Sequence, residues 1–399
     1  MAERIDRDQV IGFRLSGHGL DQRVPVADLV DAAACCGIQN SPPWAGPIAF
    51  HARVDGVTPD LVDEAVAARD LLLTWSMRGA PYYVPTADAG VFTAGVLPTT
   101  ERALRHFIPG VEHSVDRLGM SVTEAVDRAE AAVREVLAGR SMAITELGVE
   151  SAAVIAPGLS TERLRVWEAE GPHAKGQSIG EAVVHFCLRI LALRQVVCFA
   201  PRTGNKAPFV FTEEWLPRPT VAIDGTAARA ELLRRHLRCY GPTTPASFAW
   251  WLGVSTGDAC LWWDLLEPEL VEVDFGGPRW MLARDLDILR AATVPVGVRL
   301  LPPRDPYLQI RDRATLVDPS RHREVWKTVG DPGTVLVDGE LVGTWRSRKA
   351  GRNLQVTFRG FGPLGDATRK RLAVEAEHVA RVRGASTVSV EGLDVVPGE

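Results

Sequence analysis

The sequence lacks the signals of several common protein classes. It has no run of 18 or more apolar residues, and its first ten residues, MAERIDRDQV, carry charges where a signal peptide has an apolar segment. We therefore expect a cytoplasmic protein that does not associate with a membrane. The motifs H-E-x-x-H and G-x-x-x-x-G-K-[ST] are also missing, so zinc proteases and P-loop NTPases find no support.

Cysteine and histidine occur, but not in the spacing of a metal site. The six cysteines include no C-x-x-C pair, and nothing indicates a secreted protein, so we expect reduced, mostly buried thiols. The nine histidines show no ligand spacing either. The sequence therefore predicts neither a metal ion nor a cofactor. The cysteines are Cys35, Cys36, Cys187, Cys198, Cys239 and Cys260.

Lysine is scarce, since only five of the 45 basic residues are lysine, and acidic residues outnumber basic ones. The net charge of −5 argues against a protein that coats nucleic acid through its overall charge. A local basic face is still compatible with this balance, because binding follows the charge of a patch and not the sum over the chain.

The length and composition predict a folded protein of several domains. A chain of 399 residues is longer than one ordinary hydrophobic core requires. With 46% hydrophobic and 24% charged residues and no low-complexity segment, it falls in the globular range.

Three parts of the chain repeat the order of several helices followed by a β-hairpin, which is the order of a winged helix. From about residue 295 the pattern changes to strands with one long helix. We therefore predict an α+β fold with three tandem winged-helix units and a C-terminal, β-rich α+β unit. The predicted boundaries are 1–98, 99–218, 219–292 and 293–399.

A polar patch, Gln39-Asn40-Ser41, interrupts the first unit. A helix is predicted over residues 24–36, ended by Gly37, and the double proline Pro42-Pro43 follows the patch. Two interpretations are open. In one, Ser41 caps the next helix and Gln39 is a plain connector. In the other, Gln39 faces a cleft, where its amide can hold a water at one end and a base or sugar at the other.

Basic residues gather at two predicted turns. The stretch TWRSRKAGRN, residues 344–353, contains no acid and suits contact with phosphate, and Arg313 lies nearby in sequence. Arg78 occupies the turn of the first hairpin, from which a charged side chain can reach DNA. The predicted DNA contacts are Arg78, Arg313, Arg346, Arg348, Lys349 and Arg352.

A dinucleotide-type motif near the C-terminus is interpreted as a turn. GFGPLG, residues 360–365, matches G-x-G-x-x-G between a strand and a helix. Too little chain follows for the rest of a dinucleotide-binding sheet, and Pro363 removes one backbone donor. We predict a plain turn and helix entry here.

Five spaced segments together resemble winged-helix DNA glycosylases of the AlkZ/YcaQ type. They occur in the family's order and span nearly the whole chain: GIQ, TWSMRG followed by VPTAD, YGPTTPASFAWWLG, LLPPRDPYLQIRDR and VLVDGELVGTWR. The resemblance implies three winged helices wrapped into a C shape, with a basic concave face for damaged double-stranded DNA. It also implies a monofunctional glycosylase that removes alkylated or bulky-adduct purines, interstrand crosslinks included, without a metal or cofactor.

In this family, a Gln-x-Gln or Gln-x-Asp motif carries the chemistry, and here it reads Gln39-Asn40-Ser41. The resemblance makes Gln39 the residue that orients water and stabilises an oxocarbenium-like sugar. Ser41 departs from the motif, because its side chain is shorter and uncharged. Tyr82 is a second departure, since the common RGTLH pattern reads RGAPY here.

Three interpretations follow from these departures. In the first, the chain is a glycosylase in which Asn40, Ser41, Tyr82 or Asp305 supplies what the second motif residue did, and Trp44 helps to line the pocket. In the second, it binds damaged DNA without cutting it. In the third, it is an ordinary winged-helix regulator, but the sequence shows neither a dimerisation signal nor a clear recognition helix. We therefore expect a monomer.

Overall fold

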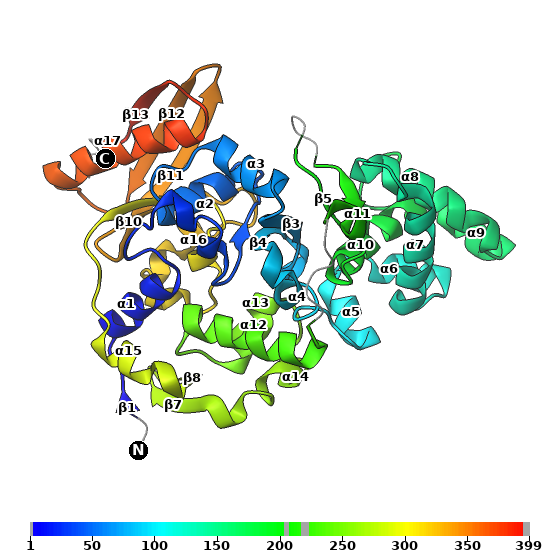
Figure 1. Ribbon diagram of the computed structural model, residues 1–399, viewed down its shortest axis with the longest axis horizontal. Coiled ribbons are helices and arrows are strands. Elements are labelled where there is room, and N and C mark those ends of the chain that lie inside the picture. The colour runs from blue at the N-terminus through cyan, green and yellow to red at the C-terminus, as the bar shows by residue number, and fades with distance from the viewer. Residues whose placement is uncertain (1–2, 203–206, 217–222, 394–399) are drawn as a thin grey trace.

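The computed structural model describes residues 3–202, 207–216 and 223–393, and it has the predicted α+β fold (Figure 1). A helical lobe at the right of Figure 1 flanks a central sheet, and a second sheet with one long helix lies at the upper left. The predicted boundary at residue 218 and the loop at 203–206 lie outside the described residues. The division into four units stays a prediction.

The first helix, α1 (Arg7–Gly17), begins at a capping box in which Asp6 and Gln9 satisfy each other's backbone N–H groups. It packs against the third unit, far along the chain. The prediction of a helix over residues 24–36, the segment that follows α1, is wrong. The segment forms two 3₁₀ turns, Val26–Asp28 and Asp31–Ala33, because apolar residues spaced by three suit the 3₁₀ repeat as well as the α-helix.

The hairpins of the first two units join one sheet. Its order is β2-β4-β3-β5-β6, and Leu73 of β3 pairs with Phe199 of β5. The rings of Trp75, Phe199 and Phe209 pack together at centroid distances of 4.6 to 5.2 Å. The strands are β2 (Ile38–Gln39), β3 (Leu71–Trp75), β4 (Pro81–Pro85), β5 (Val197–Phe199) and β6 (Phe209–Phe211).

Helices surround this sheet as the sequence predicts. Thr58 caps α3 through a hydrogen bond from the backbone N–H of Leu61, and the apolar helix expected before the second hairpin is α10. The helices of these two units are α2 (Ala45–Arg53), α3 (Pro59–Ala67), α4 (Ala89–Phe92), α5 (Glu101–Phe107), α6 (Glu112–Leu118), α7 (Val122–Leu137), α8 (Ile144–Ile155), α9 (Thr161–Glu168), α10 (Ile179–Leu193) and α11 (Thr212–Trp215).

The third unit gains a strand from the start of the chain. Glu3 and Arg4 form β1, which pairs in parallel with β7, so packing crosses the predicted unit boundaries. Its other elements are α12 (Gly225–Tyr240), α13 (Pro245–Leu252), α14 (Cys260–Trp263), β7 (Leu270–Asp274), β8 (Pro278–Leu282) and α15 (Leu286–Ala291).

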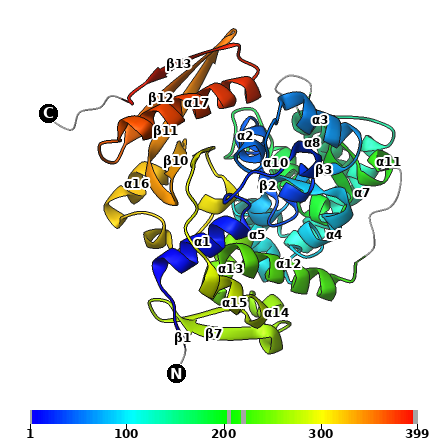
Figure 2. The ribbon, with the colours of Figure 1, turned by 60° about the vertical axis from the view of Figure 1, so that its left-hand side comes forward.

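The C-terminal unit is a five-stranded sheet of order β13-β12-β11-β10-β9, covered on one face by α17 (Figure 2). Residues 360–365 form the predicted turn and helix entry, with Gly365 at the N-cap of α17. The elements are β9 (Val298–Leu301), α16 (His322–Val325), β10 (Gly333–Val337), β11 (Glu340–Ala350), β12 (Asn353–Gly360), α17 (Asp366–Val382) and β13 (Thr387–Glu391).

One continuous hydrophobic core runs through the helices of the first three units, and a second lies between α17 and its sheet. Ile48 of α2 packs into the second core and so joins the first unit to the C-terminal unit. Within the described residues, none of the helices combines the length and apolar character that crossing a membrane requires.

A buried carboxylate also joins α2 to α17. Burial alone would raise the pKa of Glu375, but hydrogen bonds from His378 and His51 and the charge of Arg23 together lower it well below its usual range. A carboxyl with a lowered folded-state pKa stabilises the fold above its unfolded pKa of about 4.3, and this contribution is lost as the pH falls further.

We therefore predict that Glu375→Gln lowers the free energy of unfolding at pH 7 and weakens its dependence on pH below about 4.3. Urea unfolding at several pH values measures both effects. The control is Glu377→Gln, an exposed residue on the same helix, which should leave both unchanged. Equal acid sensitivity in the wild type and Glu375→Gln would contradict the assignment.

Candidate active site

Gln39 is held in a strand and not in a connector. It pairs with Tyr82 across β2 and β4, and the next residue, Asn40, donates its backbone N–H to the carbonyl of Pro81 at 2.8 Å. Residues directly opposite each other in a sheet place their side chains on the same face. The backbone pairing therefore brings the Gln39 amide and the Tyr82 phenol together.

Arg78 completes a polar cluster with these two side chains. The Gln39 Oε1 atom accepts from the Tyr82 hydroxyl at 3.1 Å and from Arg78 Nη2 at 3.4 Å. Because arginine can only donate, the amide oxygen must face it. Gln39 is 3% exposed and Tyr82 is 1% exposed. Burial raises the pKa of Tyr82, so its hydroxyl keeps its proton at neutral pH.

Gln309 is the fourth member of this polar cluster, and the sequence analysis missed it. Its Oε1 atom accepts from the same Arg78 Nη2 atom at 2.9 Å. The same Nη2 atom also donates to the Tyr82 hydroxyl at 3.1 Å. Its two protons therefore serve three acceptors, and the longest contact, to Gln39, is the weakest. The signal in the sequence was a single polar residue in the apolar stretch YLQI, within a segment that resembles the family.

The third unit fixes the position of Arg78. The backbone of Arg78 is left-handed, with φ 56° and ψ 21°. The Arg78 Nη1 atom donates to the carbonyl of Trp251 at 2.6 Å. Gly253, the C-cap of α13, has φ 96°, and a Cβ there would lie 3.0 Å from the Arg78 Cα. Arg78 was predicted to contact DNA, yet most of its donors are bound within the protein.

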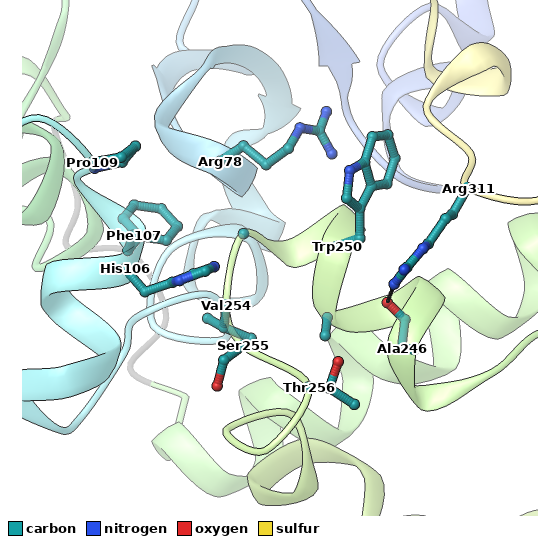
Figure 3. A pocket seen from close by; sticks show the side chains of 12 residues that line it. Arg78, His106, Phe107, Pro109, Ala246, Trp250, Val254, Ser255, Thr256 and Arg311 are labelled. Atoms are coloured by element: carbon teal, nitrogen blue, oxygen red, sulfur yellow. Dashed lines mark hydrogen bonds between the residues drawn. The ribbon is translucent and has the colours of Figure 1, made fainter.

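Arg78 also lines a cavity of about 480 Å³ to which four distant segments of the chain contribute (Figure 3). Trp250 and Arg311 stand on one side, His106 and Phe107 on the other, and Ser255 and Thr256 below. The Arg78 guanidinium lies 5.3 Å from the Trp250 ring centroid. Two guanidinium groups beside the half-buried Trp250 indole suit a ligand that is both anionic and aromatic.

Residues 253–257, GVSTG, match the nucleophile motif G-x-S-x-G, although their setting is not that of a serine hydrolase. The segment follows the end of α13 and not a strand. The Ser255 hydroxyl donates to Asp258 at 2.5 Å and accepts from the Asp258 backbone N–H at 3.3 Å. This is the local bonding of a helix cap.

The other predicted motif residues lie apart from the Gln39 amide. Asn40 is buried, and its Oδ1 atom accepts from the backbone N–H of Gly46 in the first turn of α2, a task that Ser41 was expected to perform. The Ser41 hydroxyl has no hydrogen-bond partner within the described residues. Trp44 packs on Trp345 of the C-terminal unit, 6.5 Å away.

Asp305 positions the site indirectly. It is fully buried and holds Arg53 through two hydrogen bonds of 2.8 and 2.9 Å, so its carboxylate is neutralised and is not free to act as a base. It also caps the 3₁₀ turn Pro306–Leu308 by accepting from the Tyr307 backbone N–H. That turn leads directly to Gln309.

The predicted basic residues lie mainly on the C-terminal unit. Arg346 and Arg348 are exposed and share one face of β11, opposite Thr357 and Gln355 of β12. The opposite face of this sheet packs against α17. Lys349 and Arg352 are exposed near the hairpin turn, and the Arg313 guanidinium packs on the Trp326 ring at 4.6 Å.

Among the residues that the structure describes, two groups of side chains have the chemistry to hold a metal ion, and both lie outside the Arg78 cluster. One consists of His51, Glu375 and His378, and the other of His18, Cys36 and Cys239. In the first group, Arg23 donates to both Glu375 and His51. The positive charge that Glu375 requires is therefore supplied by an arginine and not by a metal ion.

The α+β fold carries a cavity in which two arginines and an indole suit a ligand such as nucleic acid. A family model described as DNA glycosylase AlkZ-like matches residues 32–382, and the chain belongs to this family. A curated relative, the interstrand DNA cross-link repair glycosylase of Streptomyces sahachiroi, is 27% identical over 401 residues, which is 96% of this chain and 98% of the relative.

The fold is also that of a solved structure, the DNA glycosylase AlkZ of Streptomyces sahachiroi. The TM-score is 0.75 at 22% identity, and the match covers 97% of this chain and 99% of the other. At this identity the likeness concerns the fold. It extends along the whole length of both chains.

We predict that Asp305→Ala lowers the free energy of unfolding by about 3 to 5 kcal/mol, because it leaves the buried Arg53 charge unpaired. Urea unfolding measures the loss. Asp318→Ala is a matched control, since Asp318 caps the 3₁₀ turn Pro319–Arg321 in the same way but is exposed. It should cost only about 1 kcal/mol. Equal losses in the two variants would contradict a special role for the ion pair.

Proposed function

We propose that this protein is a monofunctional DNA glycosylase that acts as a monomer on damaged double-stranded DNA. It hydrolyses the N-glycosidic bond of a cationic, alkylated purine. Gln39 holds the attacking water and stabilises the oxocarbenium-like sugar. The observation that carries the proposal is the neutral cluster of two amides and a phenol around Arg78, beside the arginine-lined cavity.

The chemistry of the leaving group explains why such a cluster suffices. An alkylated, cationic purine leaves without prior protonation, so the enzyme needs no strong acid. A water that attacks an oxocarbenium-like sugar needs orientation more than a strong base. An amide accepts from the water through its oxygen, and the weak 3.4 Å contact to Arg78 leaves one lone pair of Gln39 available.

Gln309 takes the place that the second motif residue has in the family. Ser41 does not reach this cluster, whereas the Oε1 atoms of Gln39 and Gln309 share one Arg78 nitrogen atom. The site therefore has two glutamine amides from distant segments in place of a Gln-x-Gln pair. Trp250 provides a ring at the cavity wall on which a purine can stack.

A second candidate function is binding of damaged DNA without hydrolysis. The observation that favours it is the burial of Gln39, whose oxygen already accepts from Tyr82 and Arg78. In this alternative the cluster only stiffens the first hairpin. The activity measurements below separate the two functions.

The glycosylase proposal predicts base release from a duplex that carries one N7-alkylguanine. Gln39→Ala should lower the single-turnover rate at least about 100-fold, the usual loss when one polar group is removed from a transition state. Gln309→Ala should lower it as well. Alkali-induced strand cleavage at the abasic product measures the rate, and Gln22→Ala, an exposed glutamine far from the cluster, is the control.

Gel retardation measures DNA binding separately from base release, with the alkylated duplex and with a crosslinked duplex. Gln39→Ala should still bind DNA, because the phosphate contacts are made by arginines elsewhere. If the wild type binds alkylated and crosslinked duplexes but releases no base from either, the binding function is correct. The crosslinked duplex is included because the Streptomyces sahachiroi relative is named a cross-link repair glycosylase.

We further propose that Arg346 and Arg348 contact DNA phosphates from the exposed face of β11. Arg346→Glu combined with Arg348→Glu should weaken binding of any duplex. It should also reduce the slope of log affinity against log salt by about 0.9 for each lost contact. Binding titrations at several salt concentrations measure the slope.

The matched control combines Lys370→Glu with Arg381→Glu. Both residues are exposed on α17, which covers the opposite face of the same sheet, and the change in net charge is identical. An equal loss of affinity in the two double variants would show an effect of net charge alone and would remove β11 from the interface.

A further inference from the structure

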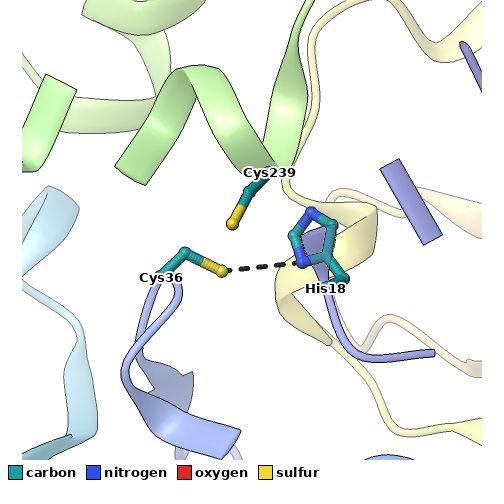
Figure 4. Close-up of side chains that lie close together, drawn as sticks. All are labelled: His18, Cys36 and Cys239. Carbon is teal, nitrogen blue, oxygen red and sulfur yellow. Dashed lines mark hydrogen bonds between the residues drawn. The ribbon is translucent and has the colours of Figure 1, made fainter. Parts of the chain in front are cut away.

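Three soft or borderline metal ligands converge in the core, away from the Arg78 cluster (Figure 4). They are His18, Cys36 and Cys239, and their ligand atoms all lie within 4.8 Å of one another. His18 directly follows α1, Cys36 precedes β2, and Cys239 lies in the last turn of α12. All three side chains are buried.

The spacing of His18 and Cys36 fits a tetrahedral zinc site, and Cys239 lies close to both. The His18 Nδ1 and Cys36 Sγ atoms are 3.5 Å apart. Bond lengths of about 2.0 Å for Zn–N and 2.3 Å for Zn–S at a tetrahedral angle give a ligand separation of about 3.5 Å. The third donor, Cys239 Sγ, now donates its proton to the carbonyl of Gly17 at 3.3 Å. That proton would leave when the thiolate binds a metal.

Cys35 is the candidate for the fourth ligand. It precedes Cys36 in the sequence, and its side chain lines the same cavity as His18. A structural zinc site is completed by a fourth cysteine or histidine ligand.

A path for an ion leads from the surface to this cluster. A cavity of about 320 Å³ is lined by His18 and Cys35, and also by Asp28 and Asp31. Asp31 is exposed and Asp28 is half-buried. Carboxylates at the entrance attract a divalent cation, while the inner ligands are nitrogen and sulfur, which zinc prefers.

We propose that His18, Cys36, Cys239 and Cys35 bind one Zn²⁺ ion as a structural site. The sequence predicts no metal site, because its cysteines and histidines show no ligand spacing along the chain. Here the ligands come from segments as far apart as residues 18 and 239, which only the fold brings together. The site is separate from the proposed glycosylase chemistry and does not depend on it.

The ion would tie the catalytic strand to the rest of the fold. Cys36 lies three residues before Gln39, so a bond from its sulfur to the metal fixes the start of β2 against α1 and α12. This is a structural role, comparable to that of closed four-ligand zinc sites.

Metal analysis of the purified full-length chain tests the proposal. We expect one zinc per chain by elemental mass spectrometry. After removal by a chelator under reducing conditions, Co²⁺ should bind with one-to-one stoichiometry, produce thiolate-to-cobalt charge-transfer absorption, and be displaced by Zn²⁺. Cys36→Ser and Cys239→Ser should each weaken Co²⁺ binding at least about 10-fold.

Cys260→Ser is the matched control, because Cys260 is an exposed cysteine outside the cluster, and it should bind as the wild type does. Cys35→Ser should also weaken binding, and unchanged binding would remove Cys35 from the ligand set. Wild-type protein with no zinc and no cobalt absorption would overturn the proposal whether or not the variants fold. So would a Cys36–Cys239 disulfide in the isolated protein, found by peptide mass spectrometry, which would mark a redox pair.

Discussion

The hydrogen bonds of the Arg78 guanidinium are the interaction on which the candidate site depends. This one group contacts β2, the edge strand of the central sheet, through Gln39 and the first hairpin through Tyr82. It also contacts α13 through the Trp251 carbonyl and the predicted C-terminal unit through Gln309. None of these partners carries a negative charge. The guanidinium therefore keeps its full charge at the cavity wall while its position is fixed by neutral dipoles.

The sequence predicts the local elements of this fold well and their association less well. Hairpins such as Leu71–Trp75 with Pro81–Pro85 follow from β-branched and aromatic residues on either side of a Gly-containing turn. The pairing of Leu73 with Phe199, and of β1 with β7, joins segments far apart in the chain, and no local pattern records it. The helix prediction over residues 24–36 was wrong, because apolar residues three positions apart suit both the α-helix and the 3₁₀ turns that form there.

The candidate site shows the same division. Gln39 and Tyr82 could be named in advance, because Gln39 is the first residue of the family's motif and Tyr82 replaces the histidine of the RGTLH pattern. Gln309 could not, because its proximity to Gln39 depends on the Arg53–Asp305 pair and the turn that Asp305 caps. Trp44 and Asp305 were expected to line a pocket, but their packing partners come from units that the sequence does not place relative to each other.

The shared sheet of the first two hairpins has a consequence for how a duplex can be recognised. Hydrogen-bonded strands of one sheet, packed through the rings of Trp75, Phe199 and Phe209, resist displacement relative to one another. In the proposed function, a duplex on this platform would therefore have to supply most of the deformation itself. Bending and unstacking cost less where a lesion has already weakened the base pairs, so a stiff platform would favour damaged over intact DNA.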